Sequence, residues 1–294
     1  MKISGFTIAR NAQKFGYPLV ESLRSLLPLV DELVVAVGDS EDRTWDLVHS
    51  LESSKLRAFR TVWDPAQRAG GRVLSAQTNL ALARCRGDWA VYLQADEVFH
   101  EDDLAVLERS LVRHHKSPLE GLRMDYLHFY GSYQTIQTHW RKWYHSAIGA
   151  VETGKSIQSV GDAYGFRMQG DGGRRLLSLG SGARVFHYGW SRPPQVMQAK
   201  QDNLDRLYHG DAAMVQHRAQ AVAEAAKLKA FYADRGYLER FRGSHPAVMT
   251  QRVLEQDWSF DDGIEAQAPW WLRQLDIAFA YPLKKRWQRW NAKA

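Results

Sequence analysis

The chain has 294 residues, of which 45% are hydrophobic and 24% are charged, a balance that argues against disorder over most of its length. Its one cysteine, Cys85, excludes an intrachain disulfide bond and a cysteine-based zinc site. The net charge of +6 and the pI of about 9.3 favour an anionic partner: a nucleic acid, a phosphorylated ligand or a membrane surface.

The sequence shows no targeting or membrane signal. Met1 leads directly into a strand-like segment, without the apolar region and cleavage site of a signal peptide. No stretch reaches the roughly 18 apolar residues that a membrane span requires. Together with the single cysteine, these features favour a cytoplasmic protein.

The first third of the chain alternates short apolar runs with segments of helical spacing. We predict strands at residues 3–9, 32–37, 56–63 and 88–93. We predict helices at residues 19–29, 44–51, 74–84 and 102–111. Strands that alternate with helices form a mainly parallel sheet in an α/β fold, and such strands end at one ligand-binding edge.

The pattern changes after about residue 107. Residues 121–144 are aromatic-rich and predicted to be irregular, whereas residues 149–182 are glycine-rich, which is typical of loops and short strands. Helices are expected at residues 195–207 and 212–232. The last segment, from Trp270 onward, mixes tryptophans with the basic residues Lys284, Lys285, Arg286 and Arg289.

An acidic pair follows the strand predicted at residues 88–93. The apolar strand delivers Asp96 and Glu97 to the ligand edge of the sheet. Oxygen ligands at such a position suit Mg²⁺ or Mn²⁺, which in turn bind a diphosphate. A second interpretation stays open, in which the pair caps the helix predicted at residues 102–111, because acidic residues are common at helix starts.

Four short motifs accompany this strand end. They are Thr7-Ile8-Ala9-Arg10-Asn11, Gly38-Asp39-Ser40-Glu41-Asp42-Arg43-Thr44, Gln77-Thr78-Asn79-Leu80-Ala81-Leu82-Ala83, and Leu93-Gln94-Ala95-Asp96-Glu97 after the Gly87-Asp88 turn. In this order they resemble the family 2 glycosyltransferases of GT-A fold, over residues 1–110 well and over the remainder weakly. The resemblance implies a Rossmann-like, mainly parallel sheet flanked by helices, a nucleoside-diphosphate sugar donor and Mn²⁺ or Mg²⁺ as cofactor.

The resemblance also implies roles for individual residues. The end of the first strand cradles the nucleotide, the loop at Asp39 contacts its base, and His187 is the late histidine that joins Asp96 on the metal. His187 can instead be a core histidine that is bonded to a backbone carbonyl. The expected donor-binding residues are Thr7, Ala9, Arg10, Asn11, Asp39, Arg72, Gln77, Gln94, Ala95, Asp96 and Arg192, and the expected metal ligands are Asp96 and His187.

Two positions depart from the family pattern. Gln94 replaces the first acidic residue of the metal motif, and an amide is a poorer metal ligand, although it can hydrogen-bond to ribose or base. Asp39 is displaced from the base-recognition position if Asp42 and Thr44 set the register. The nucleotide base is therefore not defined by the sequence.

Basic residues offer contacts to a diphosphate. Arg72 follows two glycines at a helix start, where backbone amides and an arginine form an anion site, and Gln77 lies on the same helix. Arg192 and Lys200 can approach the diphosphate as part of a lid. The alternatives are a flexible loop at Arg72 and solvated surface charges at the other two positions.

A transferase that inverts the sugar's configuration, as the family likeness suggests, needs a carboxylate that accepts the proton of the attacking hydroxyl. Asp162 is the first candidate, because it lies among glycines and aromatic residues that suit a sugar-lined cleft. Asp171 is the second, although a tight turn is its stronger interpretation. Glu97 and Glu152 stay open as further candidates.

The resemblance suggests a division of the chain into a catalytic domain at residues 1–192 and a helical C-terminal extension at residues 193–294. Within the domain, residues 1–110 form the donor half and residues 111–192 the acceptor half, where one or two aromatic residues of 126–144 can stack on sugars. Trp287 and Trp290, beside basic residues, can rest on an anionic membrane at the inner face of the plasma membrane. That would suit a glycan or lipid-linked acceptor, as in polysaccharide or lipopolysaccharide biosynthesis.

Other classes fit the sequence less well. A nucleotidyltransferase of similar fold would carry a glycine-rich loop after the first strand, where residues 10–13 contain no glycine. A dinucleotide dehydrogenase would carry Gly-x-Gly-x-x-Gly at the same place. Nucleic-acid binding is not expected, because the basic residues are scattered and match no binding motif. A non-catalytic carbohydrate-binding protein stays open because of Gln94.

Overall fold

The computed structural model describes residues 1–67, 69–139, 143–170, 172–209, 237–261, 263–264 and 267–280. Ten strands of the described chain form one sheet: β1 (Ile3–Ala9), β2 (Glu32–Val37), β3 (Leu56–Arg60), β4 (Trp89–Tyr92), β5 (Glu97–Phe99), β6 (Gly121–Tyr130), β7 (Thr135–Gln137), β8 (Ser146–Glu152), β11 (Ser178–Trp190) and β12 (Leu238–Arg240). Their order is β12-β7-β6-β8-β4-β1-β2-β3, with β11 beside β6 and β5 beside β11. A separate ribbon consists of β9 (Ile157–Val160) and β10 (Gly165–Met168).

The β1–β4 half of the sheet is the part that the sequence predicts best. Strands β3, β2, β1 and β4 are parallel neighbours, and every residue of β1 is buried. The inner strands of such a sheet are mainly apolar because helices cover both of their faces. The bounds of β1 and β2 match the prediction, and β3 and β4 lie within the predicted ranges. The α/β fold with a mainly parallel sheet in this half is thereby confirmed.

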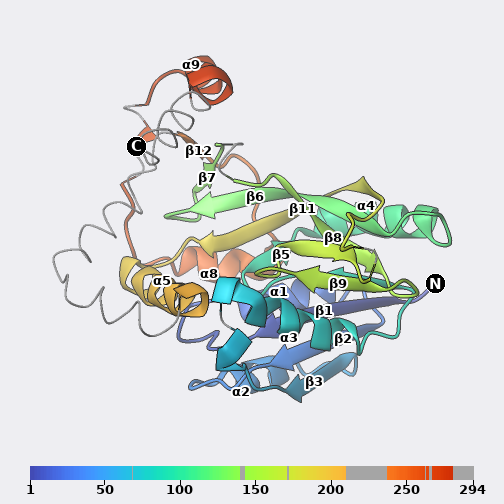
Figure 1. Ribbon diagram of the computed structural model, residues 1–294. Coiled ribbons are helices and arrows are strands. Elements are labelled where there is room, and N and C mark those ends of the chain that lie inside the picture. Colours follow the sequence, from blue (N-terminus) through green and yellow to red (C-terminus); the bar gives the residue numbers. More distant parts are fainter. Residues whose placement is uncertain are drawn as a thin grey trace, which may run out of the picture.

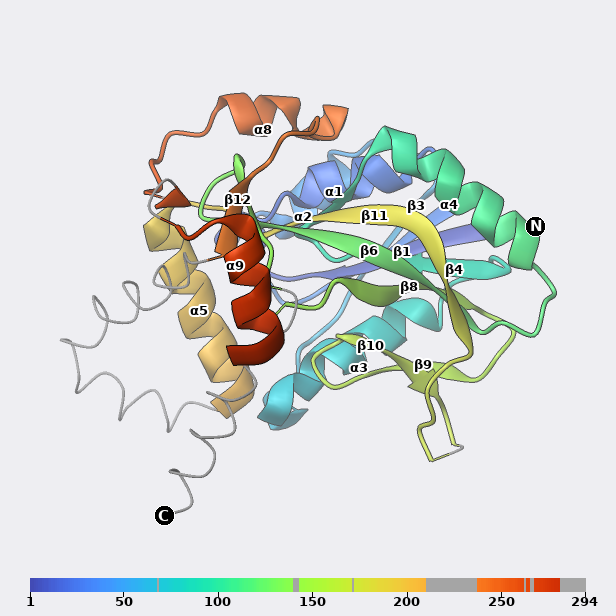
Figure 2. The ribbon, with the colours of Figure 1, turned by 90° about the horizontal axis from the view of Figure 1, so that it is seen from above.

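Different helices cover the two faces of the sheet, as Figure 2 shows. On one face, α1 (Leu19–Leu26), α2 (Thr44–His49) and α4 (Glu101–His114) bury a shared cluster that includes Leu23, Val48 and Leu107. On the other face, α3 (Arg72–Leu82) packs with the β9–β10 ribbon around residues such as Phe6 and Phe166. Burial of such side chains contributes about 1.5–3 kcal/mol each and is the main source of stability.

The second half of the sheet corrects the prediction for residues 121–144. This segment forms the long strand β6 and the short strand β7 instead of an irregular chain. Strand β6 runs parallel to β11 and antiparallel to β8, so the sheet is mixed here. A strand is normally recognised by the alternation of apolar and polar residues. In β6 this alternation is obscured, because several polar and aromatic side chains are buried against other segments of the chain.

The turn between β4 and β5 excludes the helix-cap interpretation of the acidic pair. Helix α4 begins only at Glu101, and His100 caps it by accepting a hydrogen bond from the backbone N–H of Asp102 at 3.2 Å. Glu97 lies instead in β5, opposite His187 of β11. Asp96 precedes β5, and its carbonyl accepts a hydrogen bond from the backbone N–H of Tyr188 at 2.8 Å.

Helix α5 (Pro194–His209) confirms the first helix predicted after residue 192, whereas the helix predicted at 212–232 lies outside the described residues, as do Trp287 and Trp290. Figure 1 shows α5 at the end of the sheet toward which β6 and β11 point, far from the N-terminus. The described part of the chain also contains the short helices α8 (Thr250–Leu254) and α9 (Trp270–Leu275). The described helices include none that is long and apolar enough to cross a membrane.

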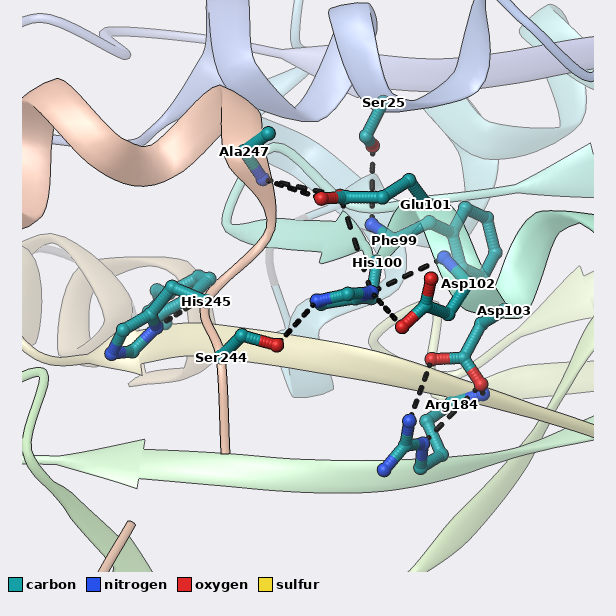
Figure 3. Close-up of polar contacts among 11 residues, drawn as sticks. Ser25, Phe99, His100, Glu101, Asp102, Asp103, Arg184, Ser244, His245 and Ala247 are labelled. Carbon is teal, nitrogen blue, oxygen red and sulfur yellow. Dashed lines mark hydrogen bonds and ion pairs between the residues drawn. The ribbon is translucent and has the colours of Figure 1, made fainter. Parts of the chain in front are cut away.

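Residues 244–252 pack on the main body, and Figure 3 shows the contacts of Ser244 and Ala247 with the start of α4. The Glu101 carboxylate accepts a hydrogen bond from the Ala247 backbone N–H at 3.1 Å, and Ser244 lies 3.0 Å from the His100 ring. Nearby, the Tyr188 hydroxyl and the His245 ring are 2.8 Å apart. Part of the C-terminal region therefore packs directly on the main body. The domain boundary at residue 192 stays a prediction.

Candidate active site

A cavity of about 290 Å³ lies at the carboxyl ends of β1 and β4. Its wall also includes residues of the β4–β5 turn, the middle of β6, the start of β8, the end of β11, the β9–β10 turn and α5. Ligands of open α/β sheets bind at this edge, so the cavity is the natural place for a nucleotide. Six of the residues that line it carry most of its polar chemistry: Arg10, Gln94, Asp96, Asp162, His187 and Lys200.

Asp96 is the anionic centre of the cavity. Its side chain is only 9% exposed and lies 2.9 Å from Lys200 Nζ, 3.8 Å from Arg192 and 3.9 Å from His187. Burial by itself raises the pKa of Asp96, but the positive charges of Lys200 and Arg192 outweigh it and hold the pKa well below its usual range. The carboxylate is therefore ionised at neutral pH.

Glu97, unlike the neighbouring Asp96, stabilises the β4–β5 turn and does not face the cavity. Its carboxyl group accepts a hydrogen bond from the Gln94 backbone N–H at 2.9 Å, which closes the β4–β5 turn. Burial raises the pKa of Glu97 to about 8, and the negative charge of Asp96 acts in the same direction. Glu97 does not line the cavity, so the structure gives no support to its role as the base.

A hydrogen-bond chain fixes the orientation of His187. The Nε2–H of His128 donates to the Tyr144 carbonyl at 2.6 Å, because a carbonyl oxygen can only accept. Burial lowers the pKa of His128 to about 4 and that of His187 to about 3, so both rings are neutral at pH 7. His128 Nδ1 therefore accepts from His187 Nδ1–H at 2.8 Å, and His187 Nε2 keeps its lone pair toward Asp96.

Asp96 and His187 fit as two ligands of a divalent ion. Asp96 Oδ1 and His187 Nε2 lie 3.9 Å apart, which leaves room for an ion about 2.1 Å from each. The described residues contain no cluster of three or more histidine, cysteine or acidic side chains with metal-binding geometry. An ion held here would complete its coordination with phosphate oxygens and water, as Mg²⁺ sites commonly do.

Lys200 enters the site from α5. Its Nζ donates to Asp96 Oδ2 at 2.9 Å and to the Gly189 carbonyl at 2.8 Å. Burial lowers the pKa of Lys200 to about 8, helped by the charge of Arg192. Only glycine fits at position 189, because a Cβ there would lie 2.4 Å from His187 Nε2 and 2.9 Å from Asp96 Oδ2.

Asp162 also lines the cavity, as does Tyr164 of the same turn between β9 and β10. Ala163, which follows Asp162, has φ of +63°, a left-handed conformation that costs a non-glycine residue about 1 kcal/mol or more. Such strain is often retained where a side chain must point into a site. Glu152 is different, since it pairs with Lys155 at 2.9 Å and does not line this cavity. Asp171 lies outside the described residues.

The predicted nucleotide-binding residues divide into three groups. Ala9, Arg10, Gln94 and Ala95 line the cavity together with Asp96. Three others lie in or after β1 and β2 and do not line the cavity. They are Thr7, buried within β1; Asn11, whose side chain accepts from the Glu41 N–H at 2.8 Å; and Asp39, which pairs with Arg10 at 3.2 Å.

Three further predictions of donor contact gain no support. Gln77 is buried in the middle of α3 and donates to the Val62 carbonyl at 3.0 Å. Arg72 is exposed at the first residue of α3, outside the cavity wall. Arg192 is not a solvated surface charge: it is 2% exposed, donates to the carbonyls of Phe15 and Tyr188, and lies behind the cavity.

Sequence reasoning missed His128 and Trp63. His128 comes to His187 only because β6 and β11 pair in that register, which no local pattern reveals. Trp63, which follows β3 in the chain, lines the cavity, and its backbone N–H donates to the Asp39 carboxylate at 3.1 Å. Two of the aromatic residues at 126–144 do line the cavity, Tyr126 and Tyr144.

The fold and the cavity together define an α/β protein with a polar cavity at the carboxyl edge of a parallel sheet. The sequence pattern of glycosyl transferase family 2 matches residues 5–170, which is more than half of the chain. The chain belongs to this family. The expected membership of this family and the expected GT-A type of α/β fold are thereby confirmed.

Solved structures with similar folds include TarS of S. aureus, at 16% identity and a TM-score of 0.40 over 69% of this chain and 39% of that one. Another is the glucosyl-3-phosphoglycerate synthase of Mycobacterium tuberculosis in complex with Mg²⁺ and UDP, at 15% identity and a TM-score of 0.35 over 70% of this chain and 77% of that one. The chain thus spans well under half of the full TarS structure. A comparison with curated proteins finds no match.

Proposed function

We propose that this protein transfers a sugar from a nucleoside diphosphate to a hydroxyl group of a glycan or lipid-linked acceptor, with inversion at the anomeric carbon. The observation that carries the proposal is that one cavity brings together Asp96, His187 and Lys200 with Asp162. Asp96 and His187 suit a divalent ion, Lys200 suits the diphosphate that such an ion accompanies, and Asp162 suits a hydroxyl that must lose its proton. Residues 1–110 would supply most donor contacts and residues 111–192 the acceptor side.

In this proposal Asp162 is the catalytic base. The acceptor oxygen forms its bond to the anomeric carbon while the bond to the diphosphate breaks, and the diphosphate leaves with the electron pair. The Asp162 carboxylate accepts the hydroxyl proton, a role that typically contributes about 10²–10⁴ in rate. Mn²⁺ or Mg²⁺, bound by Asp96 and His187, would supply charge neutralisation for the departing diphosphate.

Ligand-dependent thermal stability tests the donor class. UDP or GDP in the presence of Mn²⁺ should raise the melting temperature, because a ligand that binds only the folded state stabilises it. CMP and NAD serve as comparison ligands. Stabilisation by NAD alone would contradict the proposal and favour a different class of enzyme.

The role of Asp162 has its own test. Asp162→Asn should lower kcat about 10²-fold or more, while the affinity for the nucleotide stays within about twofold. Glu152→Gln, which removes a carboxylate of the same half outside the cavity, is the matched control. Unchanged kcat in Asp162→Asn would remove Asp162 from the mechanism.

We further propose that the C-terminal region rests on an anionic membrane at the cytoplasmic face, where a lipid-linked acceptor would be found. Helix α9, which lies beyond β12 in Figure 1, exposes Trp270 by 59% and Trp271 by 57%. Lysines and arginines follow it in the sequence from residue 284. Tryptophan beside basic residues suits the boundary between headgroups and acyl chains.

Vesicle sedimentation tests this contact. The protein should sediment with phosphatidylglycerol vesicles and stay in solution with phosphatidylcholine vesicles, because the attraction depends on anionic headgroups. The double variant Trp270→Ser/Trp271→Ser should weaken sedimentation about tenfold. Equal sedimentation of the double variant and the wild type would exclude α9 as the contact.

A further inference from the structure

A buried ammonium group occupies one side of the carboxylate that a divalent ion would use. Lys200 is 7% exposed, and its Nζ lies 2.9 Å from Asp96 Oδ2. The other oxygen of Asp96 is the one that faces His187. The side chain of Asp96 therefore has a protein cation on one oxygen and a potential metal position on the other.

The charges around Asp96 do not cancel. Lys200 and Arg192 both approach its carboxylate within 4 Å. Two positively charged side chains thus face one carboxylate at the wall of the cavity. An excess of positive charge in a partly buried site attracts an anion more strongly than it would in bulk water.

Lys200 is the cation of this pair that a ligand can reach. It lines the cavity, whereas Arg192 lies behind it and directs its guanidinium to two backbone carbonyls. An ammonium group has three N–H donors, and two of those of Lys200 point to Asp96 and to the Gly189 carbonyl. The third remains for a ligand oxygen. The ring centroids of Tyr17 and Trp190 lie 5.2 and 5.8 Å from Lys200 Nζ, and these cation–π contacts help to hold the ammonium group in place.

We propose that Lys200 is a resident cation of the donor site, which binds the diphosphate without a divalent ion and competes with that ion for Asp96. The inference rests on the proposed function and adds a specific consequence to it. A structural role alone would make Lys200 important for stability but indifferent to the nucleotide. If Lys200 is a resident cation, its removal should lower the affinity for the nucleotide and raise the affinity for the divalent ion.

Calorimetric titration of the full chain with UDP or GDP, whichever binds better, separates these roles. The wild type should bind the nucleotide in EDTA as well as in Mn²⁺. Lys200→Met should weaken binding in EDTA about tenfold or more, because a hydrogen bond from a charged donor is lost. The same variant should bind Mn²⁺ alone about tenfold more tightly, since the carboxylate loses a competing cation.

Lys155→Met is the control for the loss of one positive charge, because Lys155 pairs with Glu152 outside this cavity. It should leave both affinities within about twofold. Lys200→Gln provides a second variant that keeps a hydrogen-bond donor near Asp96, in case Lys200→Met does not fold. It should weaken nucleotide binding in EDTA like Lys200→Met.

The outcomes distinguish the inference from the function on which it rests. Binding in Mn²⁺ but not in EDTA by the wild type would overturn the resident-cation role and leave the transferase proposal intact. Equal affinities of the wild type and the Lys200 variants in EDTA would overturn it as well. No nucleotide binding under either condition would instead remove the proposed function.

Discussion

The β1–β4 half of the sheet and the β6–β11 half differ in the side chains that they bury. The strands of the first half bury apolar residues and, in β1, the hydroxyl side chains of Ser4 and Thr7, but no charged residue; β2 contributes Leu33 to Val37 without a polar interruption. The second half and the helix that follows it bury His128, His187, Arg192 and Lys200. One half thus supplies the rigid platform, and the other brings the charged and polar groups to it.

Asp96 is where the two halves meet. It stands at the end of the first half, and all three of the charged or imidazole groups near it come from the second. A buried polar network of this kind is costly unless every member has a partner. We therefore predict that a substitution at Asp96, where the two halves meet, has the largest effect. A substitution at a contact outside the cavity should have a small one.

The largest effect is expected for Asp96→Asn. Turnover should fall about 10³-fold, because the substitution removes the charge that orders the cations and any bound metal. The free energy of unfolding should also fall by about 3 kcal/mol, since Lys200 and Arg192 would stay buried without their anion. Steady-state kinetics and urea unfolding measure the two losses, and circular dichroism confirms the fold. Full turnover in this variant would refute the assignment of Asp96.

An intermediate effect is expected at His128, which lies only in the second half. His128→Leu should weaken Mn²⁺ binding about 10–100-fold, because His187 loses the partner that keeps its Nε2 lone pair toward Asp96. His128→Gln should retain most of the affinity, since an amide oxygen can accept from His187 Nδ1–H. Electron paramagnetic resonance of free Mn²⁺ measures both values. Identical affinities in the leucine and glutamine variants would show that the hydrogen-bond chain is unimportant.

The smallest effect is expected at His245, which does not line the cavity. Burial lowers the pKa of His245 to about 4, so the folded protein favours the neutral ring beside Tyr188. Its contribution to stability is complete above the unfolded pKa of about 6.5 and is lost as the pH falls from there toward 4. Between pH 7 and pH 5 the loss should be about 1 kcal/mol, allowing for partial exposure.

His245→Phe removes the titrating group and should flatten this part of the stability profile. Chemical unfolding at pH 5, 6 and 7 provides the comparison. If stability falls equally with pH in the wild type and in the variant, the protonation of His245 does not weaken the contact between residues 244–252 and the main body.

The two halves also differ in how well the sequence predicts them. Strands β1 and β2 have the predicted bounds because their short, mainly apolar segments are buried at the centre of a sheet that helices cover on both faces. Strand β6 was missed because its buried aromatic and polar residues follow no simple period. Its burial depends on β8 and β11, which lie elsewhere in the chain.

The sequence by itself determined the parallel half of the sheet, the family motifs and the place of Asp96 at a strand end, because local apolar patterns and short motifs encode these features. Tertiary structure alone decided which groups surround Asp96. His128 and His187 are 59 residues apart, and Lys200 is 104 residues from Asp96. Contacts over such distances follow from strand register and helix placement, which depend on the packing of the whole chain.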